Sequence, residues 1–265
     1  MKTVFSIGND VSGADTLLLE IGEDYCCYAM LDSSSKSFHL IRYFTFDDFE
    51  SEAKFGEVLN GLVGKEFKKV VICSAYAHAL LVPQKIFKTN DRFESVIYNT
   101  PGHSQFSDAV VERQMVNSYS IPTSLHDRIL DQFSSVVFFH AYTPTLKIYN
   151  GFVAADQVDI HFTTQNFRIL VKKEQQVHLA QTYSYKTPLD VVYYLLKICY
   201  EFNLEQSEVF LIVSGLIDQD SAMYNELHNY FLNIHFAQAP AFTLPQNEYP
   251  HYYFTSLYNL AACVS

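Results

Sequence analysis

The first residues that could do chemistry lie in a short hairpin, LLLEIGEDYCCYAML, at residues 17–31. Apolar runs on both sides of Gly22-Glu23-Asp24 predict a strand, a tight turn and a second strand. Glu20 places a carboxylate just before the turn, and Gly22 leaves the backbone open to close approach. Such a hairpin either holds a phosphate or only begins a sheet.

Other catalytic motifs are missing from the sequence. It contains no GxGxxG, HExxH, GxSxG or CxxC. Gly56 and Gly61 have the spacing of the glycines in GxxxxGK[ST], but Leu62 stands where that motif requires lysine. His228 and His235 are too loosely spaced to indicate a metal site and are more typical of surface or half-buried histidines. We predict no metal site and assign no catalytic residue.

The net charge of the chain limits which kinds of partner it can bind. The chain has 265 residues and a formal net charge of −11, and an acidic chain repels phosphate backbones unless a local basic patch overrides the total. The short basic clusters at 65–69 and 172–173 are typical of solvated strand or helix ends. We therefore expect no nucleic-acid partner.

Cysteine usage and apolar segments predict a cytoplasmic protein. Five cysteines without regular spacing favour free thiols in a reducing compartment. Cys26 and Cys27 are adjacent on a predicted strand and should point to opposite faces. The first sixteen residues contain no apolar signal region, and the most apolar helix, 191–200, is too short to span a bilayer.

The chain repeats one series of elements. A hairpin (15–32), a third strand (37–46), a helix (47–64) and a buried parallel strand (69–76) come first. About 140 residues later we predict the same series. Its members are a hairpin (158–171), a strand (177–185), a helix capped by Thr187 and Pro188, and a buried strand (209–216).

Four sequence matches at one spacing support a duplication. Glu20-Ile21-Gly22 falls on Asp159-Ile160-His161, and His39-Leu40 falls on His178-Leu179. Phe44-Thr45-Phe46 and Ile72-Cys73-Ser74 have counterparts at Tyr183-Ser184-Tyr185 and, one residue shifted, Ile212-Val213-Ser214. The equivalent histidines, His39 and His178, suggest a shared structural role. We predict that both hairpins begin a five-stranded mixed sheet.

The halves differ beyond the fourth strand. In the first half, ALLVPQKIF (79–87) is followed by loop-like sequence, a strand near 109–119, a helix at 121–135 and a strand at 135–142. The second continues with a helix (221–232), a strand (234–238), a Pro-rich loop (240–250) and a terminal helix. Asn150-Gly151 is the best local breaker, so we predict subdomains at 1–150 and 151–265.

This duplicated series resembles the actin-like ATPase superfamily, which includes sugar kinases, Hsp70-type chaperones and actin. The resemblance implies an α/β protein with a duplicated ribonuclease-H-like fold and two mixed sheets with flanking helices. Through ALLVPQKIF and YYFTSLYNLAAC (252–263), the chain is also similar to a bacterial family from Bacteroidetes. That family is actin-like in fold and has no assigned activity.

The resemblance implies which residues would meet a nucleotide. The superfamily's first hairpins carry Asp-x-Gly, where glycine admits a phosphate and the acid holds Mg²⁺ through water. Here the first hairpin keeps Glu20 and Gly22. The second keeps Asp159 but has His161 and Phe162 where a glycine is expected, with Thr163 as a remaining donor.

The adenosine loop of the superfamily has a Gly-Gly pair, and here it reads Ser214-Gly215. The vestigial nucleotide loops would thus comprise six residues: Glu20, Gly22, Asp159, Thr163, Ser214 and Gly215. For both turns an ordinary hairpin with a polar tip is favoured over phosphate binding, and no residue is placed to orient an attacking water.

Two classes of function remain, and the fold alone does not choose between them. The degraded loops favour a non-catalytic, actin-like protein-binding or assembly module with a protein or peptide partner and no cofactor. The alternative is a divergent ATPase or small-molecule kinase that binds Mg-ATP between the subdomains. A working member would share a metal between Glu20 and Asp159. In a non-catalytic descendant each acid should be solvated or paired with a local Lys or Arg.

Overall fold

The computed structural model describes residues 1–10, 13–46, 51–89, 100–148, 154–174, 176–238 and 240–264. The chain divides into two compact units. The first comprises Met1–Ile148, Pro240–Glu248 and Ser256–Ser265, and the second comprises Tyr149–Ala239 and Tyr249–Thr255. The predicted ranges 1–150 and 151–265 remain a prediction of the subdomains. Contacts group 240–248 and the last ten residues with the first unit, and the breaker at Asn150-Gly151 lies outside the described residues.

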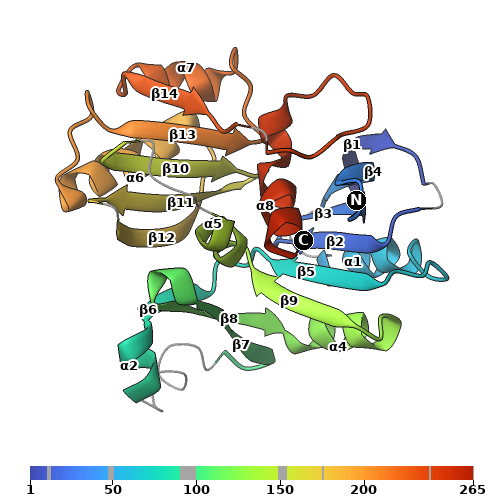
Figure 1. The fold of residues 1–265 in the computed structure, drawn as a ribbon. Helices are drawn as coiled ribbons and strands as arrows, with labels where there is room; N and C mark the ends of the chain where they lie inside the picture. The colour runs from blue at the N-terminus through green and yellow to red at the C-terminus, as the bar shows by residue number, and fades with distance from the viewer. Residues whose placement is uncertain are drawn as a thin grey trace. The chain divides into compact units, whose positions relative to one another are not determined.

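A six-stranded mixed sheet forms the centre of the first unit (Figure 1). Its strands, in spatial order, are β1 (Lys2–Gly8), β4 (Ser37–Thr45), β3 (Tyr25–Asp32), β2 (Thr16–Ile21), β5 (Lys69–Ser74) and β9 (Val136–His140). β2 pairs antiparallel with β3 and parallel with β5. β1 was not predicted. It is an edge strand with Phe5 and Ile7 buried and its other residues exposed, so its apolar signal is weak.

A five-stranded mixed sheet forms the centre of the second unit. Its spatial order is β12 (Gln176–Ser184), β11 (Asn166–Lys173), β10 (Asp156–Phe162), β13 (Phe210–Gly215) and β14 (Asn233–Phe236). β10 pairs antiparallel with β11 and parallel with β13. This is the order of the first sheet without β1, so the predicted strand series is confirmed in both units.

The two hairpins agree in register, which defines the equivalent residues. Ile21 pairs with Cys26 and Ser74, and Phe162 pairs with Phe167 and Gly215. The turns close with the same hydrogen bond, from Gly22 N to Tyr25 O (3.0 Å) and from Thr163 N to Asn166 O (2.8 Å). Gly22 is therefore equivalent to Thr163.

The sequence match of Glu20 with Asp159 was wrong by two residues. By the hairpin register Glu20 is equivalent to His161, so the acid is not repeated at this position. The match of Ser74 with Ser214 was wrong by one, because Ser74 is equivalent to Gly215. A sequence match on a strand can be wrong by two residues without any sign in the pattern, because a shift of two preserves which face each residue occupies.

The predicted equivalence of His39 and His178 is confirmed, and each histidine is the extra residue of a β-bulge. Met30 and Leu31 pair with Leu40 and Phe38, which leaves His39 unpaired in the ladder. Val171 and Lys172 pair with Leu179 and Val177, which leaves His178 in the same position. A bulge bends its strand and increases the local twist, which gives both histidines a structural role.

Helices flank the sheets. The first unit has α1 (Ser51–Asn60), α2 (Gln84–Thr89), α4 (Thr123–Gln132), α5 (Tyr142–Ile148) and most of α8 (Thr255–Val264). The second has α6 (Pro188–Phe202), α7 (Ala222–His228) and a 3-10 helix, η2 (His251–Phe254). The predicted helices are confirmed, although α7 is shorter than 221–232. Among the described residues no helix is long and apolar enough to cross a membrane.

A small antiparallel sheet replaces the single strand predicted at 109–119. It consists of β6 (Ala79–Pro83), β8 (Met115–Pro122) and β7 (His103–Val110), in that spatial order. A 3-10 helix, η1 (Val111–Arg113), separates β7 from β8, and Gln114 adopts a left-handed conformation with φ of 52°. This reversal splits the apolar segment into two strands that pair with each other.

Candidate functional site

Glu20 lies near the end of β2 and is 1% exposed. The hydroxyl of Tyr25 donates a hydrogen bond to its Oε1 at 2.5 Å. Glu20 pairs in register with Cys27 and Cys73, both buried. Burial and the nearby Glu20 carboxylate raise the pKa of both Cys26 and Cys27, which keeps these thiols neutral. The expectation of a solvated Glu20 was wrong, because the side chain lies inside the first unit.

Gly22 makes room for the same tyrosine. A Cβ at Gly22 would approach the Cδ1 and Cε1 atoms of the Tyr25 ring to less than 3.0 Å, closer than real Cβ atoms come. The ring also stacks on Tyr43 at 5.2 Å with an interplanar angle of 2°. The glycine therefore admits an aromatic ring of its own chain, and that ring carries the hydroxyl that bonds Glu20.

Asp159, on β10, is held by an amine. Lys172 of β11 is fully buried, and its Nζ forms an ion pair with Asp159 Oδ2. The Gln157 amide donates a hydrogen bond to Oδ1 of the same carboxylate. The Asp159 side chain is 22% exposed, so the pair lies at the margin of the second unit's interior. This is the local Lys partner expected for a non-catalytic acid.

Thr163 begins the second hairpin turn and is buried. Its Oγ1 donates to the carbonyl of Asn166 at 2.9 Å, and its own carbonyl accepts from the Tyr185 hydroxyl at 3.1 Å. Thr163 thus uses its side chain to close the turn, in a region where the superfamily would place a phosphate donor.

Ser214 and His161 lie side by side on the parallel strands β13 and β10. His161 Nδ1 and Ser214 Oγ are 3.0 Å apart, and Ser214 Oγ also lies 3.3 Å from the Ile160 carbonyl, to which it can donate. The serine hydroxyl is thus engaged by residues of its own sheet.

The backbone conformation at position 215 requires glycine. Its φ is +80°, and a Cβ there would overlap the Phe162 carbonyl oxygen. Leu216 N donates to that same carbonyl at 2.9 Å. Gly215 therefore ends β13 in close contact with β10.

Phe162, which stands near the position where the superfamily's second hairpin has glycine, lies in the core of the second unit. It is 1% exposed and belongs to the hydrophobic core of the second unit. Its ring stands edge-on to Tyr185 at 6.1 Å and stacks with Phe167 at 6.0 Å. The ring faces inward because period-two alternation places Phe162 on the same sheet face as Val158 and Ile160.

Sequence reasoning missed Tyr25, which contacts Glu20 and Gly22, and it was wrong about Lys172, which was interpreted as part of a solvated strand end and is buried on β11. Each had a signal. Tyr25 follows the turn directly and shares a strand face with Cys27, which pairs with Glu20. Lys172 ends a run of apolar residues on β11, where a lysine must find an anion if it is buried.

A buried polar cluster in the first unit was also missed. The Asp108 carboxylate accepts hydrogen bonds from Thr143 Oγ1 (2.7 Å), His140 N (2.9 Å) and Tyr119 Oη (3.2 Å). Burial raises the pKa of Asp108 despite these donors. The acid comes from β7, one residue before the strand that was predicted near 109–119. The described residues contain no group of three or more His, Cys, Asp or Glu that could hold a metal ion.

Sequence comparison identifies the family. A family described as "Protein of unknown function (DUF3822)" matches residues 7–234. The chain belongs to the DUF3822 family. No curated protein matches it in sequence.

Solved structures establish the fold of this DUF3822 member. A Bacteroides thetaiotaomicron protein, described as having an actin-like ATPase fold and unknown function, aligns with a TM-score of 0.76 at 16% identity. That alignment covers 95% of this chain and 97% of the other. A structure titled "PilM-PilN type IV pilus biogenesis complex" aligns with a TM-score of 0.65 at 10% identity over 95% and 98% of the two chains. The predicted actin-like architecture is confirmed.

Proposed function

We propose that this DUF3822 protein is a non-catalytic, cytoplasmic, actin-like module that binds another protein and uses no nucleotide. One observation carries the proposal. The residues expected to meet phosphate and metal are engaged by their own unit, with Tyr25 on Glu20 and Gly22, and Lys172 on Asp159.

Nucleotide binding on this fold needs glycine backbone open to a phosphate and an acid available to a hydrated metal. At Gly22 the open side of the backbone is covered by the Tyr25 ring. In the second hairpin the register puts His161 and Thr163 at the positions of Glu20 and Gly22, so no acid stands there for a hydrated metal, and Asp159, two residues earlier, is paired with Lys172. A nucleotide would therefore have to displace a packed ring at the first hairpin and would meet neither the acid nor the glycine at the second, which supports the proposal.

The fold itself is compatible with protein partnering. The PilM-PilN structure is, by its title, a complex in type IV pilus biogenesis. We extend only the general role, a protein or peptide partner, to this chain.

Calorimetry and thermal melting test the proposal. We expect Mg-ATP and Mg-ADP at millimolar concentration to give no binding heat and no shift in the melting temperature of the full chain. A ligand at a hundred times its dissociation constant would add about 2.7 kcal/mol. That corresponds to a rise of roughly 5–10 °C for a protein of this size.

Glu20→Gln is the matched control, because it keeps an acceptor for Tyr25 while removing the metal-binding charge. Nucleotide binding in the parent that is lost in Glu20→Gln, with the melting temperature unchanged, would overturn the proposal and restore the ATPase or kinase alternative.

A further inference from the structure

Strand β12 lies at the edge of the second unit's sheet, whereas its counterpart in the first unit, β4, is covered by a further strand (Figure 1). The shared hairpin register makes residues 40–45 of β4 equivalent to residues 179–184 of β12. In the first unit, β1 pairs antiparallel with 40–45. Within the described part of the second unit, β12 pairs with β11 and with no other strand.

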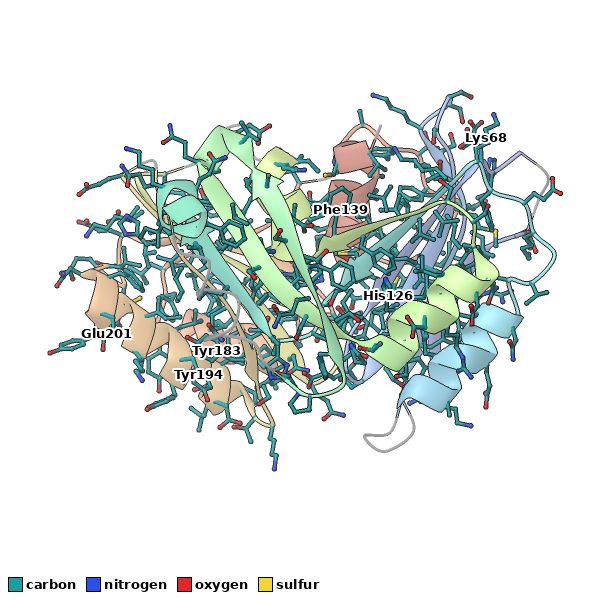
Figure 2. The ribbon with its side chains drawn as sticks, turned by 90° about the horizontal axis from the view of Figure 1, so that it is seen from below. Lys68, His126, Phe139, Tyr183, Tyr194 and Glu201 are labelled. Carbon is teal, nitrogen blue, oxygen red and sulfur yellow. The ribbon has the colours of Figure 1, made fainter. Side chains whose placement is uncertain are left out.

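The side chains at this edge of β12 are less covered than their counterparts beside β1. Leu40 is 1% exposed and Phe44 is 8% exposed, whereas the equivalent Leu179 and Tyr183 are half-buried. Tyr183 stacks on Tyr194 of α6 at 4.2 Å, and Figure 2 shows the two rings together. Apolar surface therefore follows the edge at the place where the first unit has an additional strand.

The backbone of β12 directs hydrogen-bonding groups toward this edge. Tyr185 N donates to Gln165 O at 2.9 Å, and the residues that bond a neighbouring strand alternate along an antiparallel ladder. The N–H and C=O groups of Ala180, Thr182 and Ser184 therefore point away from β11. The Thr182 carbonyl accepts a long hydrogen bond, 3.4 Å, from the side chain of the preceding glutamine, and a paired strand would replace this contact.

β12 lacks the features that commonly protect an edge strand. Lysines, prolines and short length all discourage pairing with another chain. β12 has nine residues, none of them charged and none a proline, and its bulge at His178 precedes 179–184. By contrast, the edge strand β1 has Lys2 and a register shift between Thr3 and Phe5, and β14 has only four residues.

The segment that corresponds to β1 in the second half of the chain is not a strand. Ile21 is equivalent to Phe162, 141 residues later, so the counterpart of β1 would lie at 143–149. Residues 142–148 form helix α5, which groups with the first unit. The duplication has thus left the second unit with the edge but without its covering strand.

We propose that an extended segment of a partner protein adds to the second unit's sheet as a strand antiparallel to 179–184. In strand addition, main-chain hydrogen bonds supply affinity and alternate side chains supply specificity. β1 indicates the pattern of such a segment, because Phe5 and Ile7 are buried while Ser6 between them is exposed. The partner segment carries apolar residues at alternate positions. This inference rests on the protein-binding part of the proposed function.

The second unit leaves more room for these apolar residues than the first. β1 packs its two buried residues beside Tyr43 and Ile41, and the equivalent positions on β12 are Thr182 and Ala180. Both replacements are smaller. The room favours alternate residues at least as large as phenylalanine and isoleucine in the partner segment.

The same positions disfavour a second copy of this chain as the occupant. Directly opposite residues of an antiparallel pair share one face of the sheet. A second β12 would therefore bring Ala180 and Thr182 against the same small residues and leave the room unfilled. Two copies with a net charge of −11 each would also repel one another. A segment of another protein, uncharged or basic, avoids both costs.

Fluorescence anisotropy with a labelled peptide of the β1 sequence, KTVFSIG, tests the proposal on the full chain. We expect a dissociation constant on the order of 100 μM. Asn9 N donates to His39 O, so by alternation the amides of Phe5 and Ile7 bond the neighbouring strand. N-methylation of Phe5 and Ile7 in the peptide should weaken binding about tenfold. N-methylation of Ser6, whose amide points the other way, should change it less than about twofold.

Hydrogen exchange and two proline variants locate the bound peptide. Exchange should slow at 179–184 and stay unchanged at 40–45, which β1 already covers. Ala180→Pro removes an amide that points away from β11, so the variant should fold and should bind the peptide about tenfold more weakly. Ser6→Pro, at the outer edge of β1, is the matched control and should leave binding unchanged. Circular dichroism checks that both variants fold, and the N-methylated peptides decide the question if Ala180→Pro does not.

Several results would overturn the proposal. They are no binding at about 1 mM peptide, equal effects of the two kinds of N-methylation, and protection at 40–45 instead of 179–184. A dimer of the chain at about 200 μM that Ala180→Pro dissociates would assign the edge to a second copy instead. Failure of the peptide to bind leaves the expected absence of nucleotide binding untouched, and heat from Mg-ATP leaves the result at β12 untouched, so the two tests fail separately.

Discussion

The two units place an acid on equivalent central strands, and different groups contact that acid in each unit. In the first unit, Glu20 is fully enclosed and receives a hydrogen bond from the uncharged Tyr25 hydroxyl. In the second, Asp159 is partly exposed and pairs with the buried ammonium of Lys172. Both hairpins share one register, but the acids are two positions apart. The two units thus share a hairpin register, and the contacts made by their acids differ.

The two contacts differ in how much stability should be lost when the acid is removed. Where a neutral hydroxyl meets a buried carboxylate, removal of the carboxylate leaves only an uncharged hydroxyl behind. Where an ammonium is buried, removal of the carboxylate beside it leaves a charge, and a buried charge without a counter-charge costs several kcal/mol. Loss of the acid should therefore cost more stability at Asp159 than at Glu20.

Asp159→Ala gives the largest expected effect. It leaves the Lys172 ammonium buried without this carboxylate, and we expect a loss of about 3 kcal/mol in the free energy of unfolding. Urea denaturation measures the loss, and peptide-level hydrogen exchange should place it in β10 and β11. The matched control is Asp156→Ala, at the first residue of the same strand, which should cost under about 0.5 kcal/mol. Equal losses in the two variants would show that the ion pair does not stabilise the second unit.

Gly22→Ala has the next largest expected effect. The new methyl group would overlap the Tyr25 ring, which has to shift within a packed stack, at a cost of about 2 kcal/mol. In a Tyr25→Ala background the same change should cost under about 0.5 kcal/mol, because the ring is gone. A double-mutant cycle by urea denaturation measures this coupling. Additive costs would mean that Gly22 is required for a reason other than the tyrosine.

The smallest expected effect is a pH-dependent difference in the free energy of unfolding between the parent and Asp108→Asn. Burial raises the pKa of the folded-state Asp108 above its ordinary value of 3.8, so the native state binds this proton more tightly than the unfolded chain. The contribution to stability is therefore fully present below pH 3.8 and is lost as pH rises through the folded-state pKa. The amide cannot titrate.

Unfolding in urea at several pH values between 4.5 and 7.5 should show this difference. The parent should lose stability relative to Asp108→Asn as pH rises, with the two differing by about 1 kcal/mol at pH 7. A difference that is constant with pH would contradict a buried, titrating Asp108. A difference that grows as pH falls would mean that its pKa is lowered, as for an acid paired with a cation.

The repeated series of strands and helices could be predicted from the sequence because each element carries its own periodic pattern. Apolar runs on both sides of a turn located β2 and β3, and the repeat of the series located β10 and β11. Thr187 with Pro188 located the start of α6, where the capping box is observed. β1 and the β7–β8 pair were not located. The burial of β1 and β7 is interrupted, and the place of both strands depends on pairing with other strands.

Sequence alone determined that this chain folds as a duplicated actin-like protein and that its loops depart from the superfamily's pattern at His161 and Ser214. Local patterns suffice for this, because the periodicity of a strand or a helix can be recognised within a short stretch of sequence. Only the tertiary structure decided which residues are equivalent and what occupies the loops. Register is set by hydrogen bonds between strands, and a shift of two residues leaves the alternation unchanged. The Tyr25 ring over Gly22 and the Lys172 ammonium on Asp159 are contacts made across strands, so no spacing in the sequence specified them.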